Sequence, residues 1–438
     1  MSSELWVRKL SHASLEIGGW GGTLVTDPWF SGTAFADSWA LRDYPVADAF
    51  QALFQCKYLW VSHGHPDHFS PNTLHQIPED QRLGFKVLVI DTFLNRELIQ
   101  WFEGHGYEVI RLRHRRRTHL VPGVVVECGE VHLGDSWLWL SFRGATVLNL
   151  NDCVLQPSDL RYMQKKFQGV DILALQYGVA NWTGNAEDVA EREAAARSVL
   201  DRFDRTVNVI QPKVALPFAS EFWFCHEENS HLNSSQNSSE DVVRRFESGG
   251  RSFAMLENGD LVNARGRIKR SQQVTDSRPT AVRSKGQVNF DDLQVMCASR
   301  IRETDEYHGR LRMRMYRNFV GRTSIGSVVV RLTDIGQVVA VSTSGVTKAS
   351  LDGGLDLQMS SEMFAEVVGK PYGLDNLFIG GRFRRESQRA LLKLGVVFGP
   401  DRLRSMGLRM GPGLLRHPQL LLAFVERVIS GRWTKRGR

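Results

Sequence analysis

The sequence predicts an α+β protein, with a sandwich of strands and helices in residues 1–263 and a smaller basic α+β unit after it. The length of 438 residues suits two domains of ordinary size. Short apolar strands fill the first part of the chain, and helical patterns alternate with strands later. The charge also changes sign along the chain: residues 264–438 hold 31 basic and 15 acidic residues, a net +16, so residues 1–263 carry −9 of the overall +7.

The predicted strands of the sandwich are short apolar or alternating runs bounded by Gly and Asp-Pro turns. They are expected at residues 5–10, 14–20, 22–30, 57–62, 85–91, 124–133, 136–144, 145–152, 171–178 and 214–220. A helix is expected at 92–106, where apolar residues have helical spacing and a glycine stands at the end. Further helices are expected at 71–77 and 185–206.

A polar and basic stretch, residues 264–289, is the predicted linker to the second unit, residues 290–438. In GRLRMRMYRN, Arg310, Arg312 and Arg314 alternate with other residues, which predicts one face of a strand. Further strands are expected at 327–334, 337–344 and 376–383, and helices at 363–369 and 387–397. The run LDLQMSSEMFAEVVGKPYGLDNLFIGGRF faintly resembles a sterol-carrier-type module, which presents an apolar cleft; a packing domain without a site is the alternative.

The composition restricts the classes of function. No apolar run approaches the roughly 20 residues of a membrane-spanning helix, and the N-terminus lacks the apolar segment of a secretory signal. We therefore expect a cytoplasmic protein whose five scattered cysteines are reduced thiols. No motif typical of nucleic-acid binding is present, so nucleic acid is not an expected partner. Residues 418–438 are apolar and then basic, which is typical either of a buried last helix or of peripheral contact with an anionic membrane.

The strongest functional signal is SHGHPDH, residues 62–68, directly after a predicted strand. In a loop, His63 and His65 can point the same way while Asp67 and His68 turn to a neighbouring point, which favours two adjacent metal positions over one. Imidazole and carboxylate ligands suit Zn, Fe or Mn. A histidine-rich loop arising by chance is a poor alternative, because the chain has only 13 histidines.

This His-x-His-x-Asp-His pattern after a strand resembles the signature of the metallo-β-lactamase superfamily. The resemblance implies an αββα sandwich with two metal positions, each with three ligands, and one carboxylate that bridges them. The implied ligands are His63, His65 and His132 for the first metal, Asp67, His68 and His226 for the second, and Asp152 for the bridge.

Two histidines are alternatives or additions to this set. His231 competes with His226 for the last place, and His12 in LSHASLEI matches a histidine that some branches carry near the first strand; we expect His12 to be structural. Asp67 and Asp152 are the candidate catalytic carboxylates. Two divalent cations, Fe or Zn, about 3.5–4 Å apart can activate a bridging water and polarise a second oxygen ligand.

Within the superfamily, the sequence is most similar to the CMP-N-acetylneuraminate hydroxylases. The segments that carry this resemblance are LSHASLEI, LVTDPWFSGTAFADSW, SHGHPDHFS, VHLGDSWLWLSFRGATVLNLNDC, VIQPKVALPFASEFWFCHEEN and, more weakly, YGLDNLFIGGRFRRES. Those hydroxylases carry an N-terminal Rieske domain, whose cluster is held by Cys-x-His and Cys-x-x-His pairs. This sequence does not contain that pattern. The resemblance therefore implies that an oxygenase of this kind takes its electrons from a separate donor protein or from the substrate.

Three functions stay open at this point. The first is a di-iron hydroxylase or monooxygenase that acts on a sugar-nucleotide-like or other anionic small metabolite. The arginines that can bind the phosphate or carboxylate of such a substrate are Arg310, Arg312, Arg314, Arg317, Arg382, Arg384 and Arg385. The second is a Zn-dependent hydrolase of esters, lactones, amides or phosphodiesters, which uses a metal-bridging hydroxide. The third is a binding protein that retains the site only to hold the fold.

Overall fold

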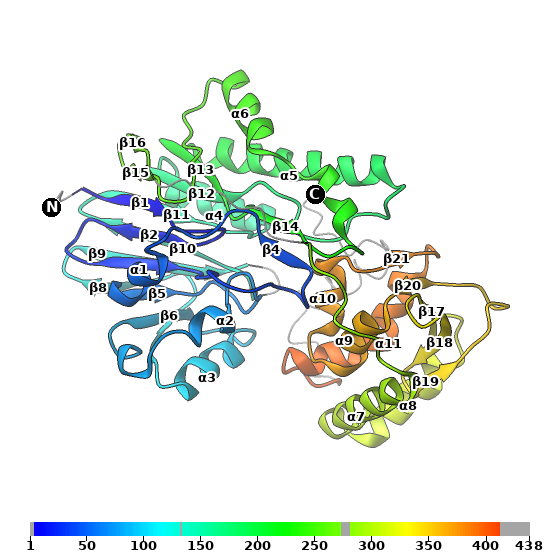
Figure 1. Cartoon of the computed structure of the whole chain (residues 1–438). Helices are drawn as coiled ribbons and strands as arrows, with labels where there is room; N and C mark the ends of the chain where they lie inside the picture. Colours follow the sequence, from blue (N-terminus) through cyan, green and yellow to red (C-terminus); the bar gives the residue numbers. More distant parts are fainter. Residues whose placement is uncertain (1–3, 132–133, 273–280, 412–438) are drawn as a thin grey trace.

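The computed structural model of the protein describes residues 4–131, 134–272 and 281–411. Its N-terminal half is a four-layer sandwich, in which two β-sheets pack face to face and helices cover the outer faces (Figure 1). The first sheet has eight described strands. In sheet order they are β16 (Ile268–Lys269), β15 (Leu261–Asn263), β1 (Trp6–Lys9), β2 (Leu15–Gly18), β3 (Thr23–Thr26), β5 (Tyr58–Trp60), β6 (Lys86–Ile90) and β7 (Glu108–Leu112).

The second sheet has six described strands. In sheet order they are β13 (Val214–Phe218), β12 (Ile172–Gln176), β11 (Ala145–Asn149), β10 (Ser136–Phe142), β9 (Val124–Glu130) and β8 (Arg116–Val121). A separate antiparallel pair is formed by β4 (Trp39–Leu41) and β14 (Phe222–Phe224). The helices of this half are α1 (Ala49–Gln55), α2 (Pro71–Leu74), α3 (Arg96–Gly104), α4 (Pro157–Phe167), α5 (Val189–Ile210) and α6 (Ser239–Ser248).

Three apolar layers hold the sandwich together. Leu88 of β6 and Leu138 of β10 belong to the layer between the two sheets. Phe102 of α3 belongs to the layer on the outer face of the first sheet, and Phe167 of α4 and Phe203 of α5 to the layer on the outer face of the second. Strands buried on both faces read as continuous apolar runs, which is why the sequence reveals them. The predicted αββα sandwich is confirmed.

The C-terminal half contains a five-stranded sheet with helices packed around it (Figure 1). In sheet order its strands are β19 (Gly345–Lys348), β18 (Gln337–Ser342), β17 (Ser327–Leu332), β20 (Leu357–Met359) and β21 (Arg384–Arg385). Its described helices are α7 (Phe290–His308), α8 (Arg310–Val320), α9 (Ser361–Gly369), α10 (Gly373–Gly380) and α11 (Ala390–Ser405). None of the helices that the structure describes combines the length and apolar character required of a membrane-spanning segment.

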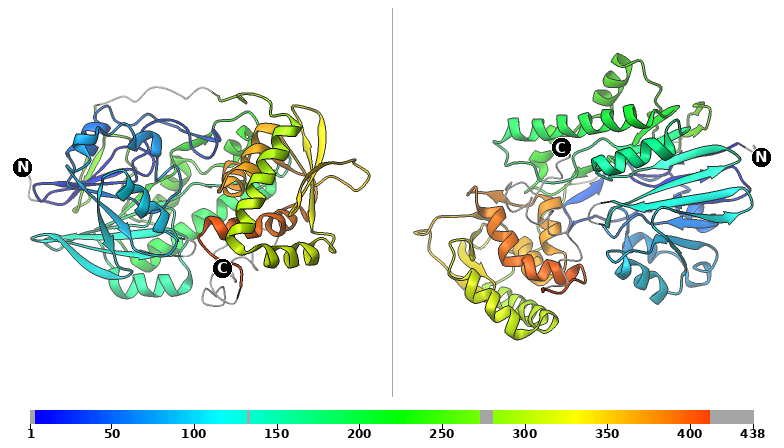
Figure 2. Two further views of the ribbon diagram at one scale, coloured as in Figure 1. Left: turned by 90° about the horizontal axis from the view of Figure 1, so that it is seen from below. Right: turned by 180° about the vertical axis from the view of Figure 1, so that it is seen from behind.

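The two halves share one apolar core. Trp39 of β4 stacks on Phe222 of β14, with ring centroids 3.7 Å apart, and both belong to the same buried cluster as Val330 of β17 and Leu377 of α10. Figure 1 and Figure 2 show the second half against the end of the sandwich near β4 and β14. The strand β16 lies inside the range 264–289 that is predicted as a linker, and it pairs with β15 at the edge of the first sheet.

Arg382 joins the halves through polar contacts. Its buried guanidinium donates to Glu228 Oε2 at 2.8 Å, to Glu362 Oε2 at 2.8 Å and to the carbonyl oxygen of Ala36 at 2.7 Å. Burial alone would lower the pKa of Arg382, but the two carboxylates outweigh it and raise that pKa. Phe35, Ala36 and Asp37 have left-handed φ values of 54°, 53° and 59°, so Arg382 supports a turn with an unfavourable backbone conformation.

Two predicted strands of the second half are wrong. Residues 309–318 belong largely to the helix α8, because Met313 and Val320 are buried at helical spacing and this outweighs the alternation of the arginines. Residues 376–380 belong to the helix α10, Gly381 ends this helix in a left-handed conformation, and the strand β21 begins only at Arg384. The order strand, helix, helix, strand of this region departs from the strand–helix–turn–strand order that suggested a sterol-carrier-type module.

Candidate metal centre

The SHGHPDH loop begins two residues after the end of β5, a strand whose three residues are all buried. The backbone N–H groups of His68 and Phe69 both donate to the carbonyl oxygen of His65, at 3.0 and 2.7 Å, and so close a tight turn. Ser136 Oγ donates to the carbonyl oxygen of Ser62 at 2.6 Å, which ties the loop to the start of β10 in the other sheet. The turn distributes the ligand-type side chains between two neighbouring groups.

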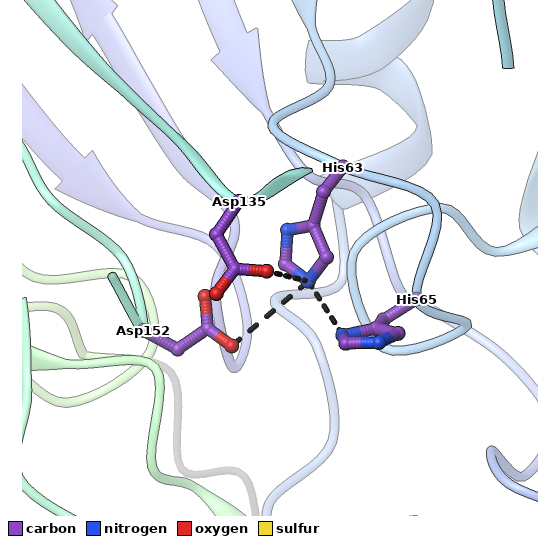
Figure 3. A group of neighbouring side chains, drawn as sticks. All are labelled: His63, His65, Asp135 and Asp152. Carbon is purple, nitrogen blue, oxygen red and sulfur yellow. Dashed lines mark hydrogen bonds and ion pairs between the residues drawn. The ribbon is translucent and has the colours of Figure 1, made fainter. Parts of the chain in front are cut away.

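The first group consists of His63, His65, Asp135 and Asp152 (Figure 3). His63 Nε2 lies 2.8 Å from His65 Nδ1, 3.8 Å from Asp135 Oδ1 and 3.9 Å from Asp152 Oδ2. Asp135 directly precedes β10, and Asp152 follows β11. Because β10 and β11 are antiparallel neighbours, the start of one and the end of the other meet at the same edge of the second sheet.

The second group consists of His12, Asp67 and His68, all buried. Asp67 Oδ2 lies 3.3 Å from His68 Nε2 and 3.5 Å from His12 Nε2. His12 lies in the turn between β1 and β2. The ring centroids of His63 and His68 are 4.3 Å apart, so the two groups are adjacent.

Burial and neighbouring charges set the protonation states of these groups. Burial lowers the pKa of His63 to about 4, so its imidazole is neutral near pH 7 and has a lone pair for a cation. Burial disfavours the charged form of Asp67, but His68 and His12 outweigh this and hold its pKa well below the usual value. Burial also disfavours a charge on His68, but Asp67, Asp27 and Asp152 outweigh it and raise the pKa of His68 well above the usual value.

Asp27 contacts His68 through the ring nitrogen that does not face Asp67. Its Oδ2 lies 3.0 Å from His68 Nδ1 and accepts hydrogen bonds from Ser62 Oγ and Asn151 Nδ2, both at 2.9 Å. Its Oδ1 accepts from the Ser62 N–H at 2.8 Å. A carboxylate on one ring nitrogen of a histidine fixes the tautomer and the orientation of the other nitrogen. Asp27 therefore directs His68 Nε2 toward Asp67.

The two groups fit divalent metal ions. Asp67 Oδ1 is buried and forms no hydrogen bond with any residue that the structure describes, and His12 Nε2 has a long contact of 3.5 Å with Asp67 Oδ2. Buried polar atoms without a partner are costly, and a bound cation would satisfy them. Neutral imidazole and carboxylate are ligands of Zn and Fe alike, and a cation at the second group would displace the proton that the neighbouring carboxylates hold on His68. The arrangement can therefore hold one cation at each group, with the two cations side by side.

Five of the seven predicted ligands lie in these groups, namely His63, His65, Asp67, His68 and Asp152. His132 lies outside the described residues.

His226 belongs to neither group. Its Nδ1 lies 3.3 Å from Glu228 Oε2, close to Arg382 in the contact with the second half. The reason is that His226 follows β14, which pairs with β4 rather than with either large sheet. The alternative ligand, His231, also lies elsewhere, with Nε2 at 3.4 Å from the carbonyl oxygen of Gly184.

Sequence reasoning missed three residues of this centre. Asp27 and Asp135 were not singled out, and His12 was expected to be structural, yet its Nε2 faces Asp67. Asp27 lies directly after β3 and Asp135 directly before β10, and His12 lies in the short turn between β1 and β2. A buried polar residue at the end of an apolar strand is the signal that could have found them, because strand ends are where such folds expose functional side chains.

A cavity of about 1140 Å³ opens onto the first group. His63 and Asp152 contribute to one part of its lining, while α10 and α11 of the second half contribute to another. The ring of Phe35, in the turn that Arg382 supports, lies 5.9 Å from the ring of His65 and also lines the cavity. Four basic residues contribute to the lining as well, namely Arg202, Arg385, Arg389 and Arg402. Both halves therefore shape the space next to the metal centre.

Residues 6–198 match the family model of the beta-lactamase superfamily domain, and this match includes both groups of ligands. This part of the chain is a metallo-β-lactamase superfamily domain. Within this superfamily domain, histidines and carboxylates that could hold metal ions are assembled at one edge of the sandwich.

Curated relatives of this metallo-β-lactamase domain include hydroxylases and Rieske-type proteins. The cytidine monophosphate-N-acetylneuraminic acid hydroxylase of Danio rerio is 25% identical over 253 residues, which cover 53% of this chain and 40% of the relative. A protein of Mycobacterium tuberculosis named as a Rieske 2Fe-2S iron-sulfur protein is 28% identical over 244 residues, which cover 52% of this chain and 46% of the relative. The match thus spans less than half the length of either relative.

Solved structures that are similar to part of this chain include a hydrolase and a hydroxylase. The metallo hydrolase Igni18 of Ignicoccus hospitalis has a TM-score of 0.40 and 14% identity, with 59% of this chain and 97% of that chain covered. The di-iron β-hydroxylase CmlA of Streptomyces venezuelae has a TM-score of 0.40 and 15% identity, with 62% and 55% covered.

Proposed function

We propose that this protein is a dinuclear metal enzyme that hydroxylates a small anionic metabolite, with two irons at the metal centre and electrons from a separate donor. The observation that carries the dinuclear part is the pair of adjacent ligand groups, linked by the 4.3 Å contact between the rings of His63 and His68. The similarity to a family of hydroxylases, which extends over 53% of the chain, favours oxygen chemistry.

The residues have separate roles in this proposal. His63, His65, Asp135 and Asp152 would hold one cation, and His12, Asp67 and His68 the other. Bound iron would supply the reduction of dioxygen. This reaction consumes two electrons and two protons; one oxygen atom is inserted into the substrate and the other is released as water. Asp152 affects both groups, since it lies 3.9 Å from His63 Nε2 and raises the pKa of His68. Asp27 keeps His68 Nε2 directed at the second cation.

The cavity supports an anionic substrate. Arg389 lines it, and its guanidinium has no hydrogen-bond or ion-pair partner among the residues that the structure describes. Arg402 is paired with Asp375 at 2.6 Å, and Arg385 contacts Glu191 at 3.5 Å. A guanidinium without a protein partner is suited to a phosphate or carboxylate, so a sugar-nucleotide-like or other anionic metabolite is the substrate class that we propose.

A zinc-dependent hydrolase is the second candidate. Hydrolysis requires water and no electron donor, and imidazole and carboxylate ligands bind zinc as well as iron. In that case the same residues would hold two zinc ions, whose chemistry is the supply of a hydroxide nucleophile at neutral pH. Esters, lactones, amides and phosphodiesters are the substrate classes to screen.

Metal analysis tests these alternatives. The protein is expressed with iron and zinc both present and purified without oxygen, and its metals are counted by plasma mass spectrometry together with Mössbauer and optical spectra. Two irons per chain, with spectra that change when oxygen is admitted, are the result that we expect. Two zinc ions and no response to oxygen would overturn the hydroxylase and support the hydrolase.

Single substitutions then test which residues bind the metals. Asp67→Ala and His68→Ala should each lower the metal content from two ions per chain to about one, because each removes a ligand of the second group. His75→Ala is the matched control, since His75 is exposed and belongs to neither group. Unchanged metal content in the Asp67 and His68 variants would contradict the assignment.

A further inference from the structure

The helix α8 exposes a continuous apolar stripe. Leu311, Met315 and Phe319 follow one another at intervals of four residues, so they lie along one face of the helix. Their exposed fractions are 72%, 59% and 72%. Met313 and Val320 are buried and attach the helix to the second half, so the stripe points away from the core. Large apolar side chains that gather on one exposed face mark interaction surfaces.

Arginines surround this stripe. Arg310 and Arg314 lie on the helix beside it, Arg322 follows the end of the helix, and all three are exposed. Arg310 contacts Glu306 at 3.8 Å, whereas Arg314 and Arg322 have no side-chain partner within the described part of the chain. Arg317, on the side of the helix that faces the protein, instead donates to the carbonyl oxygen of Thr343 at 2.8 Å. The free positive charges are therefore on the exposed side.

We propose that α8 is a docking surface for an anionic membrane. In this arrangement Leu311, Met315 and Phe319 enter the boundary between headgroups and acyl chains, and Arg310, Arg314 and Arg322 contact lipid phosphates. A helix with one apolar face and flanking basic residues has the composition of helices that lie in the membrane interface. The net charge of +16 on residues 264–438 adds longer-range attraction to an anionic leaflet.

The position of α8 and the small area of its apolar stripe favour a membrane over a protein partner. Figure 1 and Figure 2 show α7 and α8 at the outer edge of the second half, so a planar surface can approach them. Three side chains on one helix supply much less than the roughly 800 Å² per partner that stable protein interfaces bury. A bilayer needs no complementary shape and accepts a few apolar side chains together with cationic neighbours.

Vesicle binding of the full-length chain tests the proposal. Co-sedimentation is measured with vesicles of phosphatidylglycerol and phosphatidylcholine in equal parts, and with vesicles of phosphatidylcholine alone. We expect binding to the first kind that weakens as salt is added, because salt screens the arginines, and little binding to the second kind. The triple variant Leu311→Ser, Met315→Ser, Phe319→Ser should lower the partition coefficient about tenfold or more, because it removes the apolar anchor.

Two sets of control variants distinguish an effect of the α8 stripe from the effect of removing any exposed apolar or basic residue. Leu83→Ser changes an apolar residue that is 74% exposed in the sandwich half, and it should leave vesicle binding unchanged. The pair Arg310→Gln and Arg314→Gln should weaken binding at low salt, whereas Arg197→Gln with Arg116→Gln, which removes two exposed arginines from the sandwich half, should have little effect. Circular dichroism and metal content should match the wild-type protein in every variant, because α8 does not line the cavity at the metal centre.

Three results would overturn the proposal. The first is no binding of the wild-type chain to anionic vesicles. The second is equal binding by the triple variant and the Leu83→Ser protein, which would assign membrane contact to another part of the chain, such as residues 418–438. The third is a wild-type dimer that binds no vesicles and that the triple variant abolishes, which would assign the stripe to a second copy of this chain.

Discussion

Asp27 determines the geometry of the metal centre without belonging to either ligand group. Four donors surround its two oxygens: the Ser62 N–H and hydroxyl, the Asn151 amide and the ring of His68. An asparagine at this place would bring an N–H₂ group toward donors and would remove the negative charge beside His68. The orientation of His68 Nε2 would then be lost although the metal ligands themselves are unchanged.

We therefore expect Asp27→Asn to weaken metal binding at the second group by about 10- to 100-fold. Competition with a chromophoric chelator measures the affinity of each position. Asp43→Asn is the control, because Asp43 is in an exposed ion pair with Arg42. Equal affinities in the two variants would show that Asp27 does not orient His68.

His12 and His226 offer a test between two assignments of the last ligand. Both side chains are almost completely buried, with exposed fractions of 1% and 0%, so replacement by alanine should disturb packing to a similar degree. We expect His12→Ala to lower the metal content to about one ion per chain and His226→Ala to leave two, because only His12 faces Asp67. The opposite pattern, seen by plasma mass spectrometry, would return His226 to the centre.

At the scale of elements, the connection between the strands β9 and β10 contributes Asp135 to the first ligand group. Gly129 of β9 lies directly opposite Trp137 of β10. A Cβ atom on Gly129 would lie 2.3 Å from Trp137 Cζ2, and this ring is fully buried. The residue must therefore be glycine for the indole to lie flat across the strand, and the connection from β9 to β10 leads to Asp135.

Gly129→Ala should lower the free energy of unfolding by about 2 kcal/mol, because the added methyl group overpacks a rigid site. Urea denaturation followed by tryptophan fluorescence measures this change. Gly104→Ala is the control in a helix: a Cβ there meets no atom within 4 Å, so the substitution should be neutral or stabilise by up to about 1 kcal/mol. Similar losses in both variants would contradict the argument from Trp137.

A helix or strand is predicted correctly from the sequence when the pattern of buried residues that defines it is local and strong. The strand around 57–62 and the helix within 92–106 are confirmed as β5 and α3, because their burial pattern is local and strong. The helix α8 was predicted as a strand, since alternating arginines imitate the period of a strand when only two of its residues are buried. The loop ligands His63 to His68 are adjacent in sequence. His12 reaches them through the order of the strands in the first sheet, and Asp135 reaches them through the stacking of the two sheets.

At the scale of the whole molecule, Arg382 is a buried polar connection between the halves. It neutralises Glu228 from the sandwich half and Glu362 from α9, and it supports the left-handed turn at Ala36. Removal of this guanidinium would leave two half-buried carboxylates close together without a cation, which is far more costly than the loss of a surface ion pair.

Arg382→Leu should therefore lower the free energy of unfolding by about 3 kcal/mol. Arg384→Leu is the matched control two residues away, where an exposed arginine pairs with Glu187 and Glu386 and the expected loss is below about 1 kcal/mol. Thermal unfolding with calorimetry compares the two variants. A loss in Arg382→Leu as small as that of the control would mean that Arg382 contributes little to the contact between the halves.

The shared apolar cluster also affects how such a protein can change during evolution. Trp39 and Phe222 belong to the sandwich half but are packed against side chains of the second half, so either half alone would present a large unmatched apolar surface. A recombination event that exchanged the second half for an unrelated one would have to replace both sides of this contact at once. Gene segments that encode the two halves are therefore expected to be inherited as a single unit. The cavity next to the metal centre is then expected to diversify by point substitutions in both halves rather than by exchange of a whole half.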